Sequence, residues 1–216
     1  MGSVTITGGT GYLGRALIAR LIKAGHQVTA LARPASINKV PAGARIVEGS
    51  ALNADDIASA LTTECTLVLL VGTPHPNPQK AREFKEVDLA SVRAAAAAIK
   101  RSRVAHVVYV SVAHPAPVME AYIAVRTEGE RLLRETGVPL TVLRPWYVLG
   151  PGHWWPIALI PLYKLFELIP SKRDTALRLG LVTHNQMVAA LATAVTQGPS
   201  GNRVLDVPAI RLAGTS

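Results

Sequence analysis

Near its amino end the chain reads Ser3-Val4-Thr5-Ile6-Thr7-Gly8-Gly9-Thr10-Gly11-Tyr12-Leu13-Gly14. Residues 4–7 predict a β-strand, and the apolar periodicity from residue 13 onward predicts a helix. The glycines between them fit two overlapping registers, Gly8-x-x-Gly11-x-x-Gly14 and Gly9-x-Gly11-x-x-Gly14. Glycine lets the main chain turn sharply and approach a phosphate, and a helix N-terminus attracts negative charge. The stretch therefore predicts a turn that binds a dinucleotide pyrophosphate; the alternative is a strand-to-helix turn without a ligand.

Outward from this turn, short apolar runs alternate with longer helical patterns, which is the order of a parallel βαβ sheet. Strands are expected at residues 4–7, 27–32, 45–48, 67–71, 104–110 and 140–143, with 202–207 as a last strand. Helices are expected at residues 13–23, 54–61, 79–100 and 119–135. We predict an α/β, doubly wound parallel-sheet Rossmann fold. Residues 1–216 form its single domain, and residues 150–185 form a small C-terminal cap on the substrate side.

Composition narrows the class of protein. With 216 residues and 49% hydrophobic content, the chain can bury one large core. Cys65 is its single cysteine, which excludes a disulfide framework and fits a reducing compartment. The six His and one Cys show no metal-ligand spacing, so no metal is expected. Without a targeting peptide or a bilayer-length apolar run, we expect a cytoplasmic protein with no stable membrane insertion.

The formal charge of +9 does not indicate a nucleic-acid partner. Lys and Arg are scattered among alanine-rich helices, and only residues 100–103 and 172–173 form small basic groups. Such groups are typical of solvated helix ends. A positive field also suits an anionic cofactor.

The residues after the second strand favour one cofactor over another. An NAD site usually carries Asp or Glu about 20 residues past the glycines, where it binds the ribose diol. Here the strand ends Leu31-Ala32-Arg33-Pro34, without an acid. The Arg33 guanidinium suits a ribose 2′-phosphate, so NADP(H) is predicted, with NAD as the alternative. A plain surface role for Arg33 is the competing interpretation.

Several motifs together resemble the short-chain dehydrogenase/reductase superfamily, and more narrowly its atypical NmrA-like, NAD(P)H-binding, epimerase/dehydratase-like group. The matching pieces, in the family's order, are residues 7–14, 107–111, 122–126, Glu130 and 143–148. The resemblance implies cofactor contacts from three regions: the glycine turn, the end of the fourth strand and the turn near the nicotinamide. The residues concerned are Gly8, Thr10, Gly11, Tyr12, Leu13, Gly14, Gly72, Thr73, Pro145, Trp146 and Val148.

The same resemblance implies a catalytic Ser-Tyr-Lys arrangement, for which Ser111 and Tyr122 match the first two members. The third position is Arg126, one helical turn after Tyr122, where the family has Lys. A cation there favours the Tyr phenolate, but Arg cannot relay a proton as an ammonium can. The departure bears on turnover rather than on cofactor binding. Alternatively, Ser111 bonds nearby backbone at a strand end and Tyr122 is an ordinary buried aromatic.

These observations lead to an NADP-dependent oxidoreductase that acts on a small, apolar carbonyl or quinone, with epimerase or dehydratase chemistry as a variant. A non-catalytic redox sensor or assembly subunit is the alternative that Arg126 favours. A peripheral membrane oxidoreductase is a third hypothesis, because residues 154–170 predict an amphipathic helix. Core packing and the lining of a substrate cleft are the other interpretations of that helix. A monomer or loose homodimer is expected.

Overall fold

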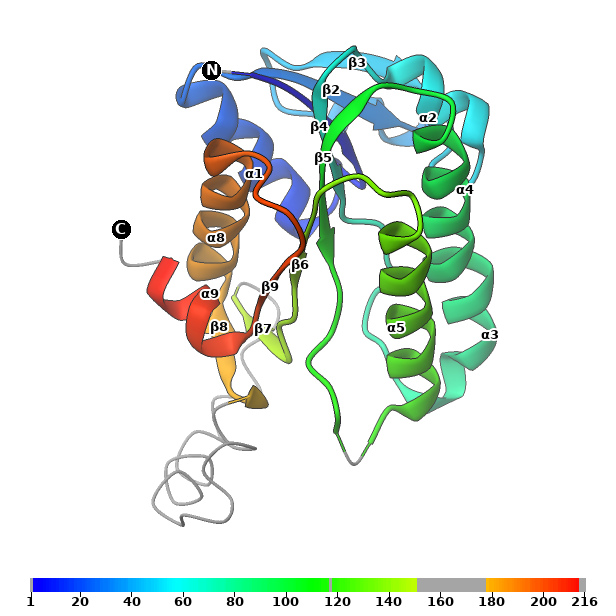
Figure 1. Ribbon diagram of the computed structural model, residues 1–216, viewed down its shortest axis with the longest axis vertical. Helices are drawn as coiled ribbons and strands as arrows, with labels where there is room; N and C mark the ends of the chain where they lie inside the picture. The colour runs from blue at the N-terminus through cyan, green and yellow to red at the C-terminus, as the bar shows by residue number, and fades with distance from the viewer. Residues whose placement is uncertain (1, 117, 151–177, 214–216) are drawn as a thin grey trace.

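The computed structural model describes residues 2–116, 118–150 and 178–213. Its centre is a seven-stranded sheet in the order β3-β2-β1-β4-β5-β6-β9, in which every neighbouring pair is parallel. The strands are β1 (Ser3–Thr7), β2 (Gln27–Ala32), β3 (Arg45–Glu48), β4 (Cys65–Leu69), β5 (Val104–Val110), β6 (Leu140–Leu143) and β9 (Arg203–Leu205). The predicted doubly wound Rossmann fold is thereby confirmed (Figure 1).

Helices cover both faces of the sheet (Figure 1). One face carries α1 (Tyr12–Lys23), α8 (His184–Gln197) and α9 (Val207–Ala213), and the other carries α2 (Ala54–Ala60), α4 (Ala90–Ile99) and α5 (Glu120–Arg134). Shorter segments are η1 (Pro34–Lys39), η2 (Pro78–Lys80), α3 (Ala81–Glu83) and the π-helical η3 (Phe84–Leu89). A separate two-stranded parallel sheet joins β7 (Tyr147–Leu149) to β8 (Leu181–Thr183).

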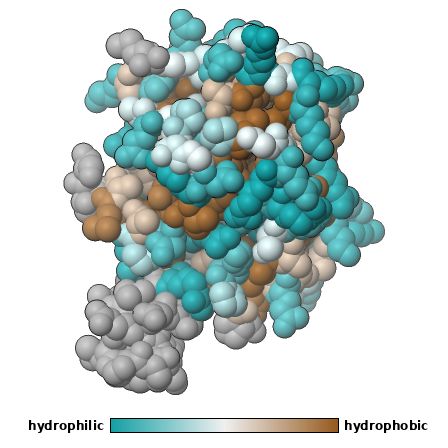
Figure 2. Space-filling model, in the orientation of Figure 1, coloured by the Kyte–Doolittle hydropathy of each residue, from teal (hydrophilic) through white to brown (hydrophobic). Residues whose placement is uncertain are grey.

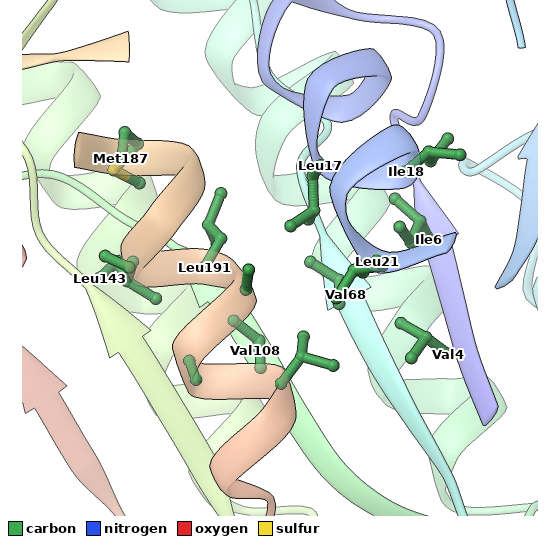
Figure 3. Close-up of a cluster of buried hydrophobic side chains, with 14 of the residues drawn as sticks. Val4, Ile6, Leu17, Ile18, Leu21, Val68, Val108, Leu143, Met187 and Leu191 are labelled. Carbon is green, nitrogen blue, oxygen red and sulfur yellow. The ribbon is translucent and has the colours of Figure 1, made fainter. Parts of the chain in front are cut away.

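Two buried clusters hold these layers together, one on each face. In the first, Leu17 of α1 and Leu191 of α8 pack over Val68 of the sheet (Figure 3). In the second, Leu67 lies on the opposite face with α2, α4 and α5. Neighbouring strand residues point to opposite faces, and helices cover both faces. Leu67 and Val68 are therefore both buried, as the continuous apolar pattern predicted. Each fully buried aliphatic side chain stabilises the fold by about 1.5–3 kcal/mol.

The strand bounds predicted at 27–32, 45–48, 104–110 and 140–143 are confirmed without change. Strand β4 both begins and ends two residues earlier than predicted. Helix α8 was not predicted, although its capping box was a usable signal. In that box Thr183 accepts from the amide of Gln186, whose side chain accepts from the Thr183 amide in return.

The surface of the molecule is mixed in polarity. Hydrophilic residues cover most of the face drawn in Figure 2, and hydrophobic residues show between them near its middle. In the part of the chain described, no helix is both long enough and apolar enough to cross a membrane. The expected amphipathic helix at 154–170 and most of the expected cap lie outside the described residues. Of the cap range, residues 181–183 form β8 and residues 184–185 begin α8.

Candidate nucleotide and substrate site

The glycine turn is shaped by two positions that admit no side chain. Gly8 has a φ of +75°, and a Cβ there would lie 2.8 Å from the Leu70 carbonyl carbon. A Cβ on Gly14 would lie 2.4 Å from the Gly8 carbonyl oxygen. The Gly11 amide donates to that same oxygen at 3.1 Å and closes the turn. Only glycine lets strand, turn and helix approach this closely.

The amino end of α1 is open to an anion. Gly11 is its N-cap, no side chain caps it, and no acid stands in its first turn. Free amides and the positive end of the helix dipole therefore face the turn. The Tyr12 ring packs on His184 with ring centroids 4.3 Å apart, and its carbonyl lies 3.0 Å from the His184 Nε2. Tyr12 therefore ties the turn to α8, and burial raises the pKa of its hydroxyl.

The predicted cofactor contacts share one edge of the sheet. The chain order reverses between β1 and β4, and in such folds ligands bind at the carboxyl ends of the strands at this point. The glycine turn follows β1, Arg33 follows β2 and is exposed, and Gly72 and Thr73 follow β4. Segments far apart in sequence thus meet at one edge of the sheet.

A cavity of about 430 Å³ opens at the same edge. Three of the residues implied by the family resemblance, Tyr122, Trp146 and Val148, meet in its wall. Tyr147, in the predicted turn near the nicotinamide, also lines the cavity, and the wall residues that sequence reasoning missed are His75, Pro76, Asn77, Val112 and Met119. The sequence could have indicated these residues only by their position, because each lies in a segment that follows a predicted strand of the parallel sheet. Such loops carry function in this kind of sheet.

Two residues of the cavity wall have unusual backbone conformations. His75 has a φ of 48° and Met119 a φ of 64°, so both occupy the left-handed region that favours glycine. A residue held there costs about 1–3 kcal/mol, and such strain clusters at functional sites. The strain supports the cavity as a site rather than a packing defect.

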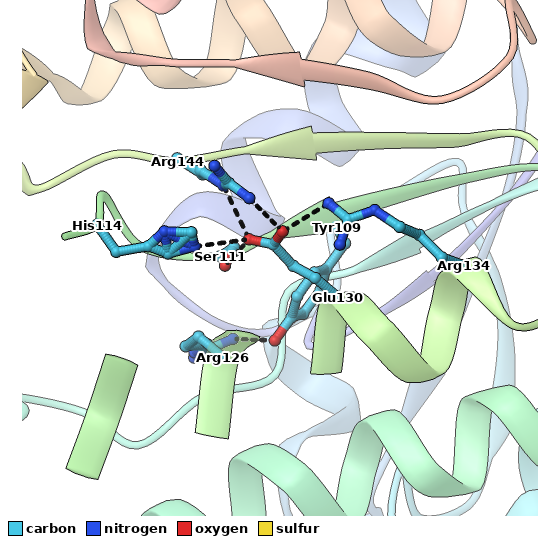
Figure 4. A network of polar contacts seen from close by, with 7 residues as sticks. All are labelled: Tyr109, Ser111, His114, Arg126, Glu130, Arg134 and Arg144. Atoms are coloured by element: carbon cyan, nitrogen blue, oxygen red, sulfur yellow. Dashed lines mark hydrogen bonds and ion pairs between the residues drawn. The ribbon is translucent and has the colours of Figure 1, made fainter. Parts of the chain in front are cut away.

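Ser111 belongs to a buried network of polar side chains (Figure 4) and is not among the described residues of the cavity wall. Its Oγ donates to a carboxylate oxygen of Glu130 at 2.7 Å. Arg144 Nε (2.9 Å) and Arg134 Nη2 (2.7 Å) also donate to this fully buried carboxylate. Burial opposes ionisation, yet hydrogen bonds from Arg144, Ser111 and Arg134 hold the pKa of Glu130 below its usual value. His114 approaches the same carboxylate at 3.8 Å, and burial together with Arg144 lowers its pKa.

Arg126 lies one turn after Tyr122, as predicted, but it is buried and already paired. Its guanidinium carbon is 5.1 Å from the centroid of the Tyr122 ring. Its Nη2 donates to Asp88 at 2.6 Å, and its side chain is 6% exposed. Sequence reasoning missed Asp88. A lone acid one turn after Phe84 and one turn before Val92, both buried, was the available signal for a buried cationic partner.

Comparison with known proteins identifies the architecture. Residues 8–150, well over half of the chain, match the family described as NAD(P)H-binding. The chain belongs to this family. The resemblance to atypical short-chain dehydrogenase/reductases is confirmed, whereas the NmrA-like subtype stays a prediction. No curated relative matches the sequence.

Solved structures share the fold of this NAD(P)H-binding protein at low identity. The Bordetella bronchiseptica enzyme WbmH, in complex with NAD+, has a TM-score of 0.69 at 19% identity; the match covers 95% of this chain and 76% of WbmH. UDP-N-acetylglucosamine 4-epimerase from Bacillus cereus has a TM-score of 0.68 at 16% identity, with 95% and 79% covered. MoeE5, in complex with UDP-glucose and NAD, has a TM-score of 0.68 at 22% identity, with 94% and 75% covered. At these identities the likeness establishes the fold alone.

The described residues also bear on metal chemistry. Among them, no group of three or more His, Cys, Asp or Glu side chains could hold a metal ion. Cys65 is a free, buried thiol at the start of β4.

Proposed function

We propose that this protein is an NADP(H)-dependent oxidoreductase that transfers hydride to or from a carbonyl or quinone of low polarity. The observation that carries the proposal is the position of Tyr122. It lies in the wall of a cavity whose other wall residues are largely aromatic and aliphatic, at the edge where the nicotinamide half of a dinucleotide would lie. Transient oxidation, as in epimerase or dehydratase chemistry, is a variant of the same reaction.

The residues present fit the cofactor. A Cβ on Gly8 or Gly14 would collide with neighbouring main chain, so only glycine allows the tight strand-turn-helix packing that a pyrophosphate-binding turn needs. When bound, the nicotinamide supplies or accepts the hydride. Thr10, Leu13 and the turn at Pro145 are proposed as further contacts.

Tyr122 is the proposed proton donor or acceptor for the substrate oxygen. Ser111 remains a predicted partner, but its own proton lies on the hydrogen bond to Glu130, so it can only accept a hydrogen bond while that contact lasts. Proton transfer therefore rests on Tyr122.

Arg33 supports NADP(H) rather than NAD. It is exposed at the end of β2, and the residue before it, Ala32, is buried and brings no acid. A guanidinium at this position can bind a 2′-phosphate through two parallel hydrogen bonds.

The cavity supports an uncharged substrate. Among the described residues its wall contains no Lys or Arg, and His75 is its one basic side chain. A nucleotide sugar of the kind bound by MoeE5 carries a diphosphate, which needs cationic or amide donors. We therefore favour an apolar carbonyl or quinone.

A non-catalytic redox sensor or assembly subunit is the second candidate, and one observation favours it. The cation beside Tyr122 is already paired with the Asp88 carboxylate at 2.6 Å, so little of its charge is left to act in the site. The two candidates differ in turnover but not in cofactor binding.

A direct experiment separates them. Purified protein is given NADPH and a panel of aromatic aldehydes, ketones and quinones, and the loss of NADPH absorbance is followed. Turnover that Tyr122→Phe abolishes supports the oxidoreductase. Tight NADPH binding without turnover on any member of the panel supports the sensor.

A further inference from the structure

Arg126 reaches the carboxyl ends of two neighbouring strands at once. It projects from α5, and its Nη1 donates to the Val110 carbonyl oxygen at 3.0 Å. The same nitrogen lies 3.5 Å from the Val71 carbonyl oxygen and 3.4 Å from the Tyr109 hydroxyl. One planar guanidinium thus bridges the end of β5 and the segment that follows β4.

Asp88 extends this bridge to the next residue of the loop. It lies on the π-helical segment η3 and is 1% exposed. One of its oxygens accepts from Arg126, and the other accepts from the Thr73 amide at 3.0 Å and the Thr73 hydroxyl at 2.6 Å. π-helical segments are rare and occur often at functional sites. A single buried carboxylate therefore connects α5 to residue 73.

Gly72 lies directly over this pair. It is exposed, and a Cβ on it would lie 2.4 Å from the Arg126 Nη2 and 3.4 Å from the Asp88 Oδ1. The main chain can pass this close to the guanidinium only because residue 72 has no side chain. Both residues that the family resemblance names as cofactor contacts after β4, Gly72 and Thr73, are thus placed by Asp88 and Arg126.

The loop that the pair holds adjoins the glycine turn. A Cβ on Gly8 would lie 2.8 Å from the Leu70 carbonyl carbon and 2.9 Å from the Val71 amide nitrogen. A small displacement of residues 70–73 would therefore change the crevice next to the pyrophosphate. The charges of Asp88 and Arg126 cancel at 2.6 Å, so little net charge is left to act on a ligand.

We propose that Asp88 and Arg126 are a buried positioning pair that holds residues 70–73 in the conformation that receives the nicotinamide half of the cofactor. Arg126 acts from beneath the loop and does not contact the cofactor. The proposal rests on the NAD(P)H binding of the family and does not depend on turnover. It also assigns a role to Arg where related enzymes have Lys, since one ammonium cannot reach Asp88 and two strand-end carbonyls as a planar fork does.

The test measures two ligands on the same variants by titration calorimetry. One is the whole dinucleotide, NADPH, or NADH if the wild type prefers it. The other is the matching adenine half alone, adenosine 2′,5′-bisphosphate or ADP. For Arg126→Lys and Asp88→Asn we expect the dinucleotide to bind roughly tenfold more weakly or worse, because sub-ångström placement of a site matters. The adenine half should bind as it does to wild type.

Arg131→Lys is the matched control. Arg131 lies on the same helix but is exposed, and among the described residues its ion pairs are with Glu128 and Glu135, so the same substitution should leave both affinities unchanged. Thr73→Val is a milder variant, which removes the 2.6 Å hydroxyl bond and keeps the ion pair, and it should weaken dinucleotide binding less. It keeps the test decisive if Asp88→Asn does not fold.

Each remaining outcome counts against the proposal. Arg126→Lys binding the dinucleotide as tightly as wild type, or more tightly, would show that the fork is not needed. Equal losses for the dinucleotide and its adenine half would show that the pair only supports the fold. A wild-type protein that binds neither ligand would remove the cofactor assignment itself.

Discussion

The glycine turn and the cavity lie at the same edge of the sheet, but they are built in opposite ways. The turn consists of eight consecutive residues, 7–14, and the groups that would meet a ligand are main-chain amides. The cavity takes its wall from four separate segments, 75–77, 112, 119–122 and 146–148, and presents side chains. One half of the site is local and made of backbone, whereas the other is assembled by the fold.

The difference shows how the two halves respond to substitution. A site made of backbone depends on the absence of side chains at its glycines, because a Cβ added at Gly14 would have no room. A site made of side chains depends on particular groups, of which the Tyr122 hydroxyl is the one proposed to react. Substitutions in the turn should therefore affect cofactor binding and folding, and substitutions in the cavity should affect chemistry.

The largest expected effect is on the cavity side. Tyr122→Phe keeps the ring contact with Phe84, whose centroid is 4.9 Å away, and removes only the hydroxyl. Turnover on an active carbonyl or quinone should fall by roughly 10²–10⁴-fold, as for loss of a general acid. NADPH affinity should not change. Tyr147→Phe, in the same cavity wall, is the control and should retain most of the activity. Normal turnover by Tyr122→Phe would contradict the proposed role.

The second expected effect is on the buried network around Glu130. Glu130→Gln removes the carboxylate that accepts from Arg144 and Arg134, whose side chains are partly exposed, so the free energy of unfolding should fall by about 1.5–3 kcal/mol. Urea unfolding measures this, with the exposed Glu135→Gln as a control that should change little.

The pH dependence of the same variant has a definite sign. Since the pKa of Glu130 is lowered in the folded state, its contribution is fully present above the pKa of an unfolded Glu. That contribution is lost as the pH falls through the folded value. The difference in stability between wild type and Glu130→Gln should therefore shrink toward acid. A difference that stays constant from neutral to acid pH would contradict the ion-pair account.

The third prediction concerns the backbone half. Gly14→Ala places a Cβ against the Gly8 carbonyl, so stability should fall by about 1–3 kcal/mol or more and cofactor binding should be lost. Gly137→Ala separates crowding from backbone strain, since Gly137 has a φ of +75° and nothing lies within 4 Å of its would-be Cβ. That control should lose roughly 1–2 kcal/mol of stability and keep its cofactor affinity. An equal loss of cofactor affinity in Gly14→Ala and Gly137→Ala would show that crowding at the turn is not what weakens binding.

The smallest expected effect is the choice of cofactor. Arg33→Ala should weaken NADPH binding by about 1.5–3 kcal/mol, roughly tenfold or more, and leave NADH binding nearly unchanged. Arg20→Ala, an exposed Arg in the last turn of α1, is the control. Equal affinities of the wild type for NADPH and NADH would show that Arg33 does not select the cofactor.

Local pattern determined much of this protein. Apolar runs gave β2, β5 and β6 their bounds, because burial on both faces leaves a largely apolar signature in a short strand. The glycines of residues 8–14 determined the turn, and Gly25 and Gly137 end their helices with positive φ, because these conformations exclude most other residues. Each of these features depends on residues close together in the chain.

Tertiary structure decided the remainder. Periodicity identified Tyr122 and Arg126 as neighbours on one helix, but only the fold placed Asp88 beside Arg126, 38 residues away in the chain. In the same way only the fold placed Glu130 where it accepts a hydrogen bond from Ser111, the other predicted catalytic residue. A buried charge needs a partner, and the partner is the polar group that packing places next to it. Because the two residues can be far apart in the chain, no sequence periodicity relates them. The glycine turn can therefore be predicted from the sequence. The partners of the polar side chains near the cavity depend on contacts that form only when the chain folds.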